Sequence, residues 1–367
     1  MKIFFSCGET SGDRYAAGLI NAMSQTNPAI QCYGNGGEHL RSSGAKLLFN
    51  VVDKSTIGFI EPIAKIPFFL KVLKKTKACI EKEKIKMVII IDHQGFNIPL
   101  ARWCKSKGIA VYSFIAPQFW MLGNLKSAKT FVESCEHIFC VLKKEYDFYH
   151  ELAPKKVTYI GHPLVGMLPK RNPSKTTLVG LFPGSRPQEI KYCLPIMLKI
   201  MDDIHETYPN IQFKLALASE KMKPFIERFL GSRSVEITKN SKDLIATATI
   251  SLVASGTVSL EHAIIGTPCI VMYQFSKISY SIAAAMVLKK LQEHCDGFMA
   301  MPNILAEKEV CPEFLQSKAT PENILPILKE LLEDDHLVNE ITSDYKQIRN
   351  TLTQGQSPFE KVAQTLL

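Results

Sequence analysis

The sequence predicts an α/β protein with two doubly wound parallel sheets. Short apolar runs alternate with amphipathic stretches along most of the 367 residues, and this alternation is typical of parallel strands joined by right-handed helical crossovers. Most of the runs are rich in β-branched or aromatic residues, do not alternate with polar residues, and are followed by Gly, Pro or Ser. Strands buried on both faces of a parallel sheet have this pattern. The series begins again after a segment rich in Pro and Lys at residues 163–175, which predicts two domains.

Nine strands are expected, at residues 2–6, 87–91, 111–115, 137–141, 157–160, 178–182, 211–217, 249–254 and 269–272. Helices are expected at residues 13–23, 100–107 and 258–265, and throughout the chain from about residue 321. The first domain should therefore cover residues 1–165 and be completed by a C-terminal helix at about 345–367. The second should cover residues 166–344.

Composition narrows the classes of partner. The formal net charge of +9 suits nucleic acid, an anionic membrane surface or a phosphorylated substrate. The sequence has no Arg-rich run, zinc finger or RNA-binding aromatic signature, so nucleic acid is not expected. The ten cysteines are scattered without a C-x-x-C pair, which predicts reduced thiols in a cytosolic protein and no metal site. The N-terminal apolar stretch is too short for a signal peptide. No apolar run approaches the roughly 18 residues needed to span a bilayer, so any membrane contact should be superficial.

The first candidate ligand loop, residues 7–13, directly follows the first expected strand. It carries Gly8, Thr10, Ser11 and Gly12 at a helix start, where backbone N–H groups can approach a ligand. The alternative is an ordinary tight turn in which Ser11 or Asp13 caps the helix.

The second candidate loop, residues 182–186, ends on Arg186. An arginine at the mouth of such a turn suits bidentate contact with phosphate or with a base carbonyl. The alternative is that Arg186 pairs with Glu189 on the following helix.

The third candidate loop, residues 254–257, places Ser255, Gly256 and Thr257 before a helix that carries Glu261. Small residues at a helix N-terminus form an anion site that needs no metal, and Glu261 could reach ribose hydroxyls. The alternative for Glu261 is a capping contact or a solvated helix face. The three loops together predict a nucleotide held in the cleft between the domains.

Eight segments, in this order, resemble the lipid-A-disaccharide synthase family over roughly residues 1–316. The segments are GETSGD (8–13), GFIEPI (58–63), ID-x-x-x-FN (91–97), APQFW (116–120), GHP (161–163), PGSRPQEI (183–190), ASGTVSLE (254–261) and PNILA (302–306).

The resemblance implies a GT-B glycosyltransferase that acts without a cofactor. Members of the family transfer 2,3-diacylglucosamine, with inversion, from UDP-2,3-diacylglucosamine to the 6-hydroxyl of 2,3-diacylglucosamine 1-phosphate. The products are a lipid A disaccharide precursor and UDP. The resemblance further implies a cytoplasmic enzyme, monomeric or homodimeric, on the inner-membrane surface of a Gram-negative bacterium.

Residue roles follow from the same resemblance. Asp92 matches the family's essential carboxylate and is the candidate general base, with a strand-end cap as the alternative. Contacts with the UDP-sugar are expected from Ser185, Arg186, Ser255, Gly256, Thr257, Glu261 and Asn303. The acceptor or cleft loop should include Gly8, Glu9, Thr10, Ser11, Asp13 and Asn97.

An apolar stretch with proline breaks, residues 59–73, precedes and overlaps a series of lysines at 71–86. This pattern suits insertion into the surface of an anionic membrane and corresponds to the family's membrane-docking region. The alternative is a core helix with a solvated lysine face. The docking residues are expected to be Phe59, Ile63, Ile66, Phe68, Phe69, Leu70 and Leu73.

The chain departs from the family pattern at three positions. Gly95 stands where an acidic residue is usual, Gly123 lies in the altered segment after Trp120, and Gln274 replaces an arginine. These changes concern the acceptor side and leave two alternatives open: another UDP-sugar enzyme of the same fold, or a membrane-associated nucleotide-sugar binder without activity. His93 is not expected to share a site with Asp92, and His162 is expected to pack rather than react.

Overall fold

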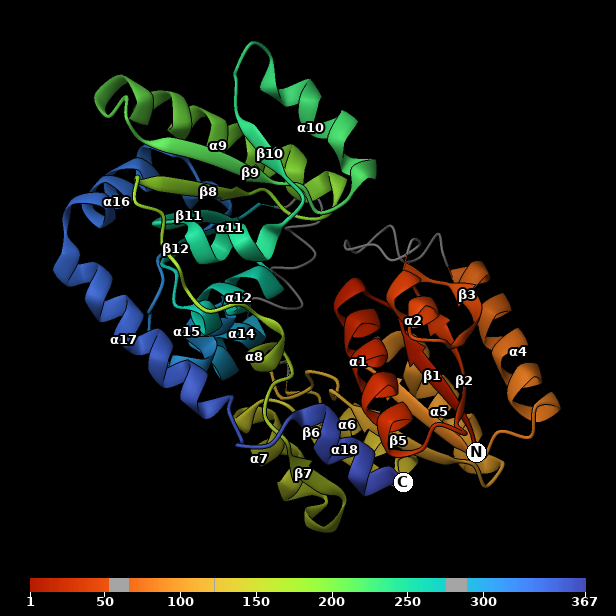
Figure 1. The fold of residues 1–367 in the computed structure, drawn as a ribbon. Coiled ribbons are helices and arrows are strands. Elements are labelled where there is room, and N and C mark those ends of the chain that lie inside the picture. Colours follow the sequence, from red (N-terminus) through yellow and green to blue (C-terminus); the bar gives the residue numbers. More distant parts are fainter. Residues whose placement is uncertain (53–65, 122, 275–288) are drawn as a thin grey trace. The chain divides into compact units, whose positions relative to one another are not determined.

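The computed structural model describes residues 1–52, 66–121, 123–274 and 289–367. The chain divides into two compact units (Figure 1). The first combines Met1–Pro163 with Thr351–Leu367, and the second is Leu164–Asn350. Each unit contains its own parallel sheet.

The sheet of the first unit has the strand order β3-β2-β1-β4-β5-β6-β7 among the described residues. All neighbouring strands are parallel. The order changes direction between β1 and β4, so the loops after these two strands flank the switch point of the sheet. The strands are β1 Lys2–Cys7, β2 Gln31–Gly36, β3 Lys46–Asn50, β4 Met87–Ile91, β5 Ala110–Phe114, β6 His137–Cys140 and β7 Val157–Tyr159.

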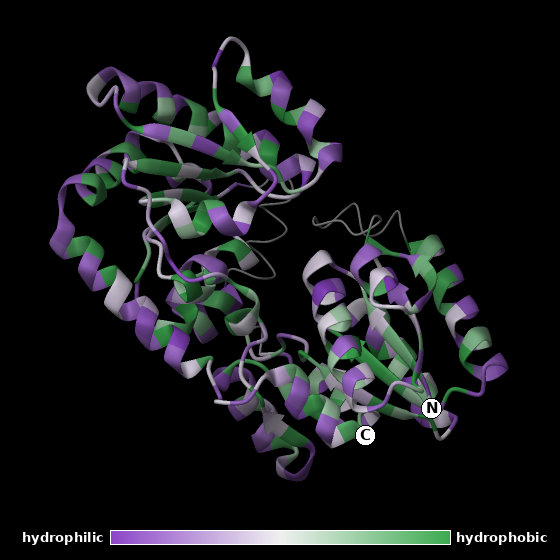
Figure 2. Ribbon diagram, in the orientation of Figure 1, coloured by the Kyte–Doolittle hydropathy of each residue, from purple (hydrophilic) through white to green (hydrophobic). Residues whose placement is uncertain are grey.

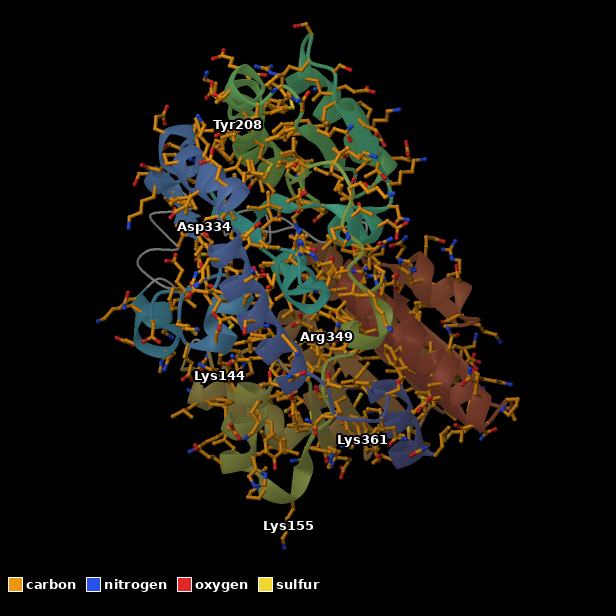
Figure 3. All side chains as sticks on the ribbon, turned by 60° about the vertical axis from the view of Figure 1, so that its left-hand side comes forward. Lys144, Lys155, Tyr208, Asp334, Arg349 and Lys361 are labelled. Atoms are coloured by element: carbon orange, nitrogen blue, oxygen red, sulfur yellow. The ribbon has the colours of Figure 1, made fainter. Side chains whose placement is uncertain are left out.

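Helices of the first unit include one from the far end of the chain. Helix α18 packs on α1 (Figure 1), where Gly18 leaves room for the ring of Phe359. That ring also meets Phe114, with centroids 5.9 Å apart. Lys361, labelled in Figure 3, donates to the Tyr159 carbonyl at 3.0 Å. The helices are α1 Thr10–Thr26, α2 Glu38–Ser42, α4 Ile66–Lys82, α5 Gln94–Ser106, α6 Leu125–Ser134, α7 Lys143–Leu152, the 3₁₀ turn Pro154–Lys156 and α18 Pro358–Leu366.

The sheet of the second unit repeats this topology, with the order β10-β9-β8-β11-β12-β13 in the described part of the chain. Its switch point therefore lies between β8 and β11. The strands are β8 Leu178–Phe182, β9 Gln212–Ala216, β10 Glu236–Thr238, β11 Ile250–Ala254, β12 Cys269–Tyr273 and β13 Glu313–Leu315.

Helices α16 and α9 pack together in the second unit. Tyr208, labelled in Figure 3, follows α9 and donates to Glu333 at the end of α16. The helices are α8 Leu164–Met167, α9 Pro187–Thr207, α10 Lys223–Leu230, α11 Ser241–Thr247, α12 Thr257–Ile265, α14 Lys289–Cys295, α15 Met301–Ala306, α16 Pro321–Glu333 and α17 Asp335–Thr351, with 3₁₀ turns at Glu220–Met222 and Gln316–Lys318.

The predicted fold class is confirmed, and all nine expected strands are present within one or two residues of their expected ends. Four further strands, β2, β3, β10 and β13, were not expected. Three of them are short edge strands, which need less apolar sequence because one side of each is unpaired. Strand β2 has the sequence QCYGNG, and a side chain at Gly34 would lie 2.6 Å from the Phe5 carbonyl oxygen. The glycines of β2 let this strand pack closely on its neighbours. They also interrupt the run of β-branched and aromatic residues by which a strand is recognised in a sequence.

Apolar residues are frequent in the strands of both sheets, which appear largely or partly green in Figure 2. The core strands β1, β4, β8, β11 and β12 are buried along nearly their whole length. In the described ranges, no helix combines the length and hydrophobicity that crossing a membrane requires.

The packing of α18 predicts a stability contribution from Phe359. Replacing Phe359 with Ala should lower the free energy of unfolding by about 2 kcal/mol, because a half-buried aromatic contact with Gly18 and Phe114 is lost. The neighbouring exposed Glu360 is the matched control, and Glu360→Ala should change stability by less than about 0.5 kcal/mol. Urea denaturation measures both, and equal effects would refute the docking role of α18.

Candidate functional site

Four loops at the two switch points carry most of the residues predicted to bind or react. In the first unit, Gly8–Ser11 follow β1 and Asp92 follows β4. In the second, Ser185 and Arg186 follow β8, and residues 255–257 follow β11. Open parallel sheets bind ligands at these places, because the loops diverge there and leave a crevice.

Asp92 stands on a strained and tightly held backbone. Its φ is +46°, and that of His93 is +49°. The Asp92 N–H donates to the Ile115 carbonyl at 3.2 Å, and the Asn97 side-chain amide donates to the Asp92 carbonyl at 2.7 Å. Ile115 itself has φ +68°, which is costly for a β-branched residue. The left-handed residues Asp92 and His93, together with Ile115, which is hydrogen-bonded to Asp92, therefore fix the direction of the Asp92 side chain.

The Asp92 carboxylate has the ionisation expected of a general base. The residue keeps exposed surface, yet the protein around it displaces part of the water that would solvate its charge. This desolvation, together with the negative charge of Glu9, raises the pKa of Asp92 to about 6. At neutral pH the group is ionised, and it accepts a proton more readily than an ordinary aspartate.

Asn97 and Asp13, predicted as acceptor-loop residues, both bind main-chain groups of the first unit. The Asn97 amide accepts from Ser6 Oγ at 2.6 Å and donates to the carbonyls of Ser6, Ile91 and Asp92, so it joins the ends of β1 and β4. Asp13 is 1% exposed. Its carboxylate accepts the N–H groups of Gly37, His39 and Leu40 at 2.6, 3.0 and 3.1 Å. These contacts use the polar atoms that a ligand would need.

His93 belongs to an aromatic cluster beside Asp92. Its ring lies 5.4 Å from that of Phe69 and stacks on that of Phe96 at 5.8 Å. Desolvation lowers the pKa of His93 to about 4, so the ring is neutral at pH 7. A side chain at Gly8 would lie 2.3 Å from the imidazole, so this glycine makes room for His93. His162 is also a packing residue, as expected: its buried ring meets that of Tyr15 at 5.9 Å.

Helix α4 carries the described part of the predicted docking region. Ile66 and Leu70 are 50% and 60% exposed, whereas Phe68, Phe69 and Leu73 pack partly into the core. The first turn of α4 is coloured hydrophobic in Figure 2, and Phe69 connects it to His93. Phe59 and Ile63 lie outside the described residues.

The loop after β8 contains the Arg186–Glu189 ion pair, which is the alternative that the sequence allows for Arg186. Arg186 Nη1 lies 2.9 Å from Glu189 Oε1, and Glu189 Oε2 accepts the Ser185 N–H at 2.8 Å. Gly184 has φ +105°, and a side chain there would lie 2.4 Å from Glu189 Oε2. Glu189 thus folds back under the turn and holds the guanidinium at its mouth, which explains the spacing G-S-R-x-x-E.

The loop after β11 presents the N-terminus of α12. Gly256 has φ +155° and ψ −163°, a conformation almost confined to glycine. Gly256 and Thr257 are exposed, and no described atom lies within 4 Å of the place where a Gly256 side chain would be. The first N–H groups of a helix have no partner within it and carry partial positive charge, so this loop can hold an anion.

Glu261 and Asn303, which are predicted to contact the UDP-sugar, are both buried. Glu261 is buried within α12. Asn303 is fully buried, and its amide donates to Cys311 O and Glu313 Oε2 and accepts from the N–H groups of Val310 and Cys311. Its hydrogen-bonding capacity is filled, so contact with UDP would require these bonds to break. Asn303 shapes the loop after α15, and its contact with UDP stays a prediction.

Gln274, one of the departures from the family pattern, also has a structural partner. Its side-chain amide donates to the carbonyls of Gln316 and Ala319 at 3.1 and 2.8 Å. Gln274 therefore ties the end of β12 to the segment that follows β13.

The sequence did not indicate Ile115, Glu145 or Tyr273. Tyr273 ends β12 and is buried near Glu189, and burial followed by the charge of Glu189 raises its pKa. Glu145 is 1% exposed and accepts the N–H groups of Val141 and Leu142 at 2.7 and 3.3 Å. The one available signal for Glu145 was an acid in the first turn of a helix that follows a buried strand.

Solved structures with the same fold include nucleotide-sugar enzymes. One is UDP-GlcNAc 2-epimerase from Neisseria meningitidis bound to UDP-GlcNAc, with 13% identity, TM-score 0.62 and coverage of 100% of this chain and 99% of that one. Another is S. aureus MnaA in a co-structure with UDP, with 13% identity, TM-score 0.66 and coverage of 100% and 95%. At this identity the likeness shows the GT-B-like fold alone.

Sequence comparison identifies the family. The family model described as lipid-A-disaccharide synthetase matches residues 3–365. Lipid-A-disaccharide synthase of Trichlorobacter lovleyi is 31% identical, over 91% of this chain and 88% of that protein. The Syntrophus aciditrophicus enzyme of the same name is 31% identical, over 95% and 93%. The chain therefore belongs to the lipid-A-disaccharide synthase family, the glycosyltransferases of lipid A biosynthesis.

Proposed function

We propose that the chain moves 2,3-diacylglucosamine from UDP-2,3-diacylglucosamine to the 6-hydroxyl of 2,3-diacylglucosamine 1-phosphate, with inversion. The observation that carries this proposal is the placement of Asp92 and the Arg186 and Gly256 loops at the switch points of the two sheets, in a chain of this family. Incubation with both lipids in detergent should give disaccharide 1-phosphate and UDP by mass spectrometry. No product from protein that still binds UDP would favour a binder without activity.

Asp92 is the proposed general base. Its carboxylate takes the proton of the acceptor 6-hydroxyl while that oxygen attacks the anomeric carbon on the face opposite UDP. The bond from the anomeric carbon to UDP breaks, and its electron pair leaves with the diphosphate. The fixed backbone of Asp92 supports this role, because a base must be held within hydrogen-bond reach of the hydroxyl.

Arg186, Ser185 and residues 255–257 are the proposed UDP site. Arg186 supplies positive charge, and the exposed N-terminus of α12 supplies N–H groups that are already oriented. Glu261, one turn further along α12, is proposed for the ribose hydroxyls. These groups can stabilise the departing diphosphate, and the proposal includes no metal or other cofactor.

The exposed apolar residues of α4 are the proposed membrane contact. Ile66 and Leu70 lie on the helix that also exposes Lys71, Lys74 and Lys75. Apolar side chains bordered by lysines suit the surface of an anionic bilayer. Since Phe69 connects this helix to His93, lipid chains near α4 would lie close to the base. We therefore propose a peripheral enzyme on the cytoplasmic face of the inner membrane.

The base assignment predicts a pH-rate profile. The pKa of Asp92 is about 6, so kcat/KM should fall as pH drops through about 6 and the base takes up a proton. Glu9→Gln should move this acid limb to lower pH, because the charge of Glu9 helps to raise the pKa. Steady-state rates between pH 4.5 and 9 measure the limb, and an unchanged limb in Glu9→Gln would refute the assignment.

Asp92→Asn should lower kcat by about 10²- to 10⁴-fold, the usual contribution of a general base. Binding of UDP, measured by calorimetry, should stay unchanged. Asp147→Asn is the control, because Asp147 is a half-exposed carboxylate of the same unit that pairs with Lys143; it should keep wild-type kcat. Full activity in Asp92→Asn would rule out this base.

Arg186→Ala should weaken UDP binding by about 10- to 100-fold, because a charge-assisted contact with the diphosphate is lost. Arg233→Ala is matched to it, since Arg233 also pairs with a carboxylate, Asp202, in the second unit. The control should bind UDP normally. Equal affinities of both variants in a titration with UDP would argue against Arg186.

Leu70→Glu should reduce binding to vesicles containing anionic lipid by about tenfold or more, because an apolar contact is replaced by a charge. Leu367→Glu is the control, since Leu367 is also an exposed leucine but lies at the end of the chain. Co-sedimentation compares the two. If both variants lose binding alike, α4 is not the contact.

A further inference from the structure

Glu145 lies in the first turn of α7, and its carboxylate is buried against the ends of two strands. It accepts the Val141 and Leu142 N–H groups, which follow β6. The backbone N–H of Ala116, which follows β5, also faces this carboxylate. One carboxylate therefore joins the loop after β6 to the loop after β5.

The Ala116 N–H belongs to the same peptide group as the Ile115 carbonyl. That carbonyl accepts the Asp92 N–H at 3.2 Å. The peptide group is thus held by Glu145 on one side and holds Asp92 on the other. Since Ile115 has φ +68°, the group would relax to a different orientation without a partner for its N–H.

A second contact from α7 supports the same loop. The Tyr149 hydroxyl donates to the Pro117 carbonyl at 2.6 Å, and both residues are buried. Glu145 and Tyr149 lie four positions apart, on one face of α7. Helix α7 therefore fixes residues 115–117 at two adjacent points.

We infer that Glu145 is a positioning residue for the glycosyl transfer: through the Ile115–Ala116 peptide group it holds Asp92 in its left-handed conformation. The inference rests on the proposed role of Asp92. Glu145 does not itself touch a substrate in this scheme, because its side chain is buried behind the loop.

Ionisation of the two acids is consistent with this arrangement. Burial raises the pKa of Glu145 to about 8, and the charge of Asp92 acts in the same direction. Among the described residues, the titratable groups around Asp92 are Glu9 after β1, His93 beside it, and Glu145 and Tyr149 on α7. Near neutral pH, negative charge is therefore favoured on Asp92 over Glu145.

Glu145→Ala tests the inference against Glu145→Gln, which keeps one acceptor oxygen. In Glu145→Ala, kcat should fall at least about tenfold while UDP affinity changes by less than about twofold. The acid limb of kcat/KM should also move to lower pH, because a relaxed loop admits water to Asp92 and so lowers its pKa. Glu145→Gln should recover most of kcat and the wild-type limb.

Two further variants keep the test decisive. Tyr149→Phe should move the acid limb of kcat/KM in the same direction as Glu145→Ala, with a smaller loss of kcat. It provides the test if Glu145→Ala does not fold. Asn240→Ala removes another side chain that accepts a main-chain N–H, in the second unit, and should leave the limb in place.

A wild-type acid limb in both Glu145→Ala and Tyr149→Phe would overturn the inference, even if stability falls. Failure of the proposed function gives a different result, because the wild-type protein would then form no product, whereas failure of the base assignment alone would leave Asp92→Asn active.

Discussion

The candidate site of the first unit depends on the hydrogen bonds that hold the backbone of Asp92. Its N–H is bonded to the Ile115 carbonyl and its C=O to the Asn97 amide, and this pair of bonds stabilises a left-handed residue at the end of β4. Left-handed conformations of residues other than glycine cost free energy and persist only where neighbours determine them. Here the neighbours are the ends of β1 and β5, so the side chain is fixed by three strands of one sheet.

Carboxylates that accept main-chain N–H groups recur beside the switch-point loops of both units. Asp13 holds the turn after β2, Glu145 the turns after β5 and β6, and Glu189 the turn after β8. Glu313 binds the N–H groups before α15 in the same way. Each acid satisfies backbone donors that burial would otherwise leave unpaired, which is costly. Rigid loops are the result, and such loops can present a base or an anion site with little reorganisation.

The polar and apolar parts of the candidate site are adjacent in the first unit. His93 follows Asp92 directly and stacks within the cluster of Phe69 and Phe96, which leads to the exposed Ile66 and Leu70 of α4. The low pKa of His93 keeps this ring uncharged, so the apolar surface extends to the carboxylate. This arrangement suits a substrate with a sugar hydroxyl and acyl chains.

The sequence alone determined the fold class, nine of the strands and the family, because buried parallel strands have continuous apolar runs and the motifs stand in order. It could not separate ligand-binding polar residues from structural ones. Asn97, Asp13 and Asn303 lie in motifs beside glycines or strand ends, and there a polar residue has the same pattern whether it binds a ligand or the main chain. Only the tertiary structure decided which groups of the chain these residues bind, because the partners, such as Ser6 for Asn97 and Gly37 for Asp13, are distant in the chain. The role of Glu145 is hidden from the sequence for the same reason, since its connection to Asp92 passes through Ala116 and Ile115, which follow another strand.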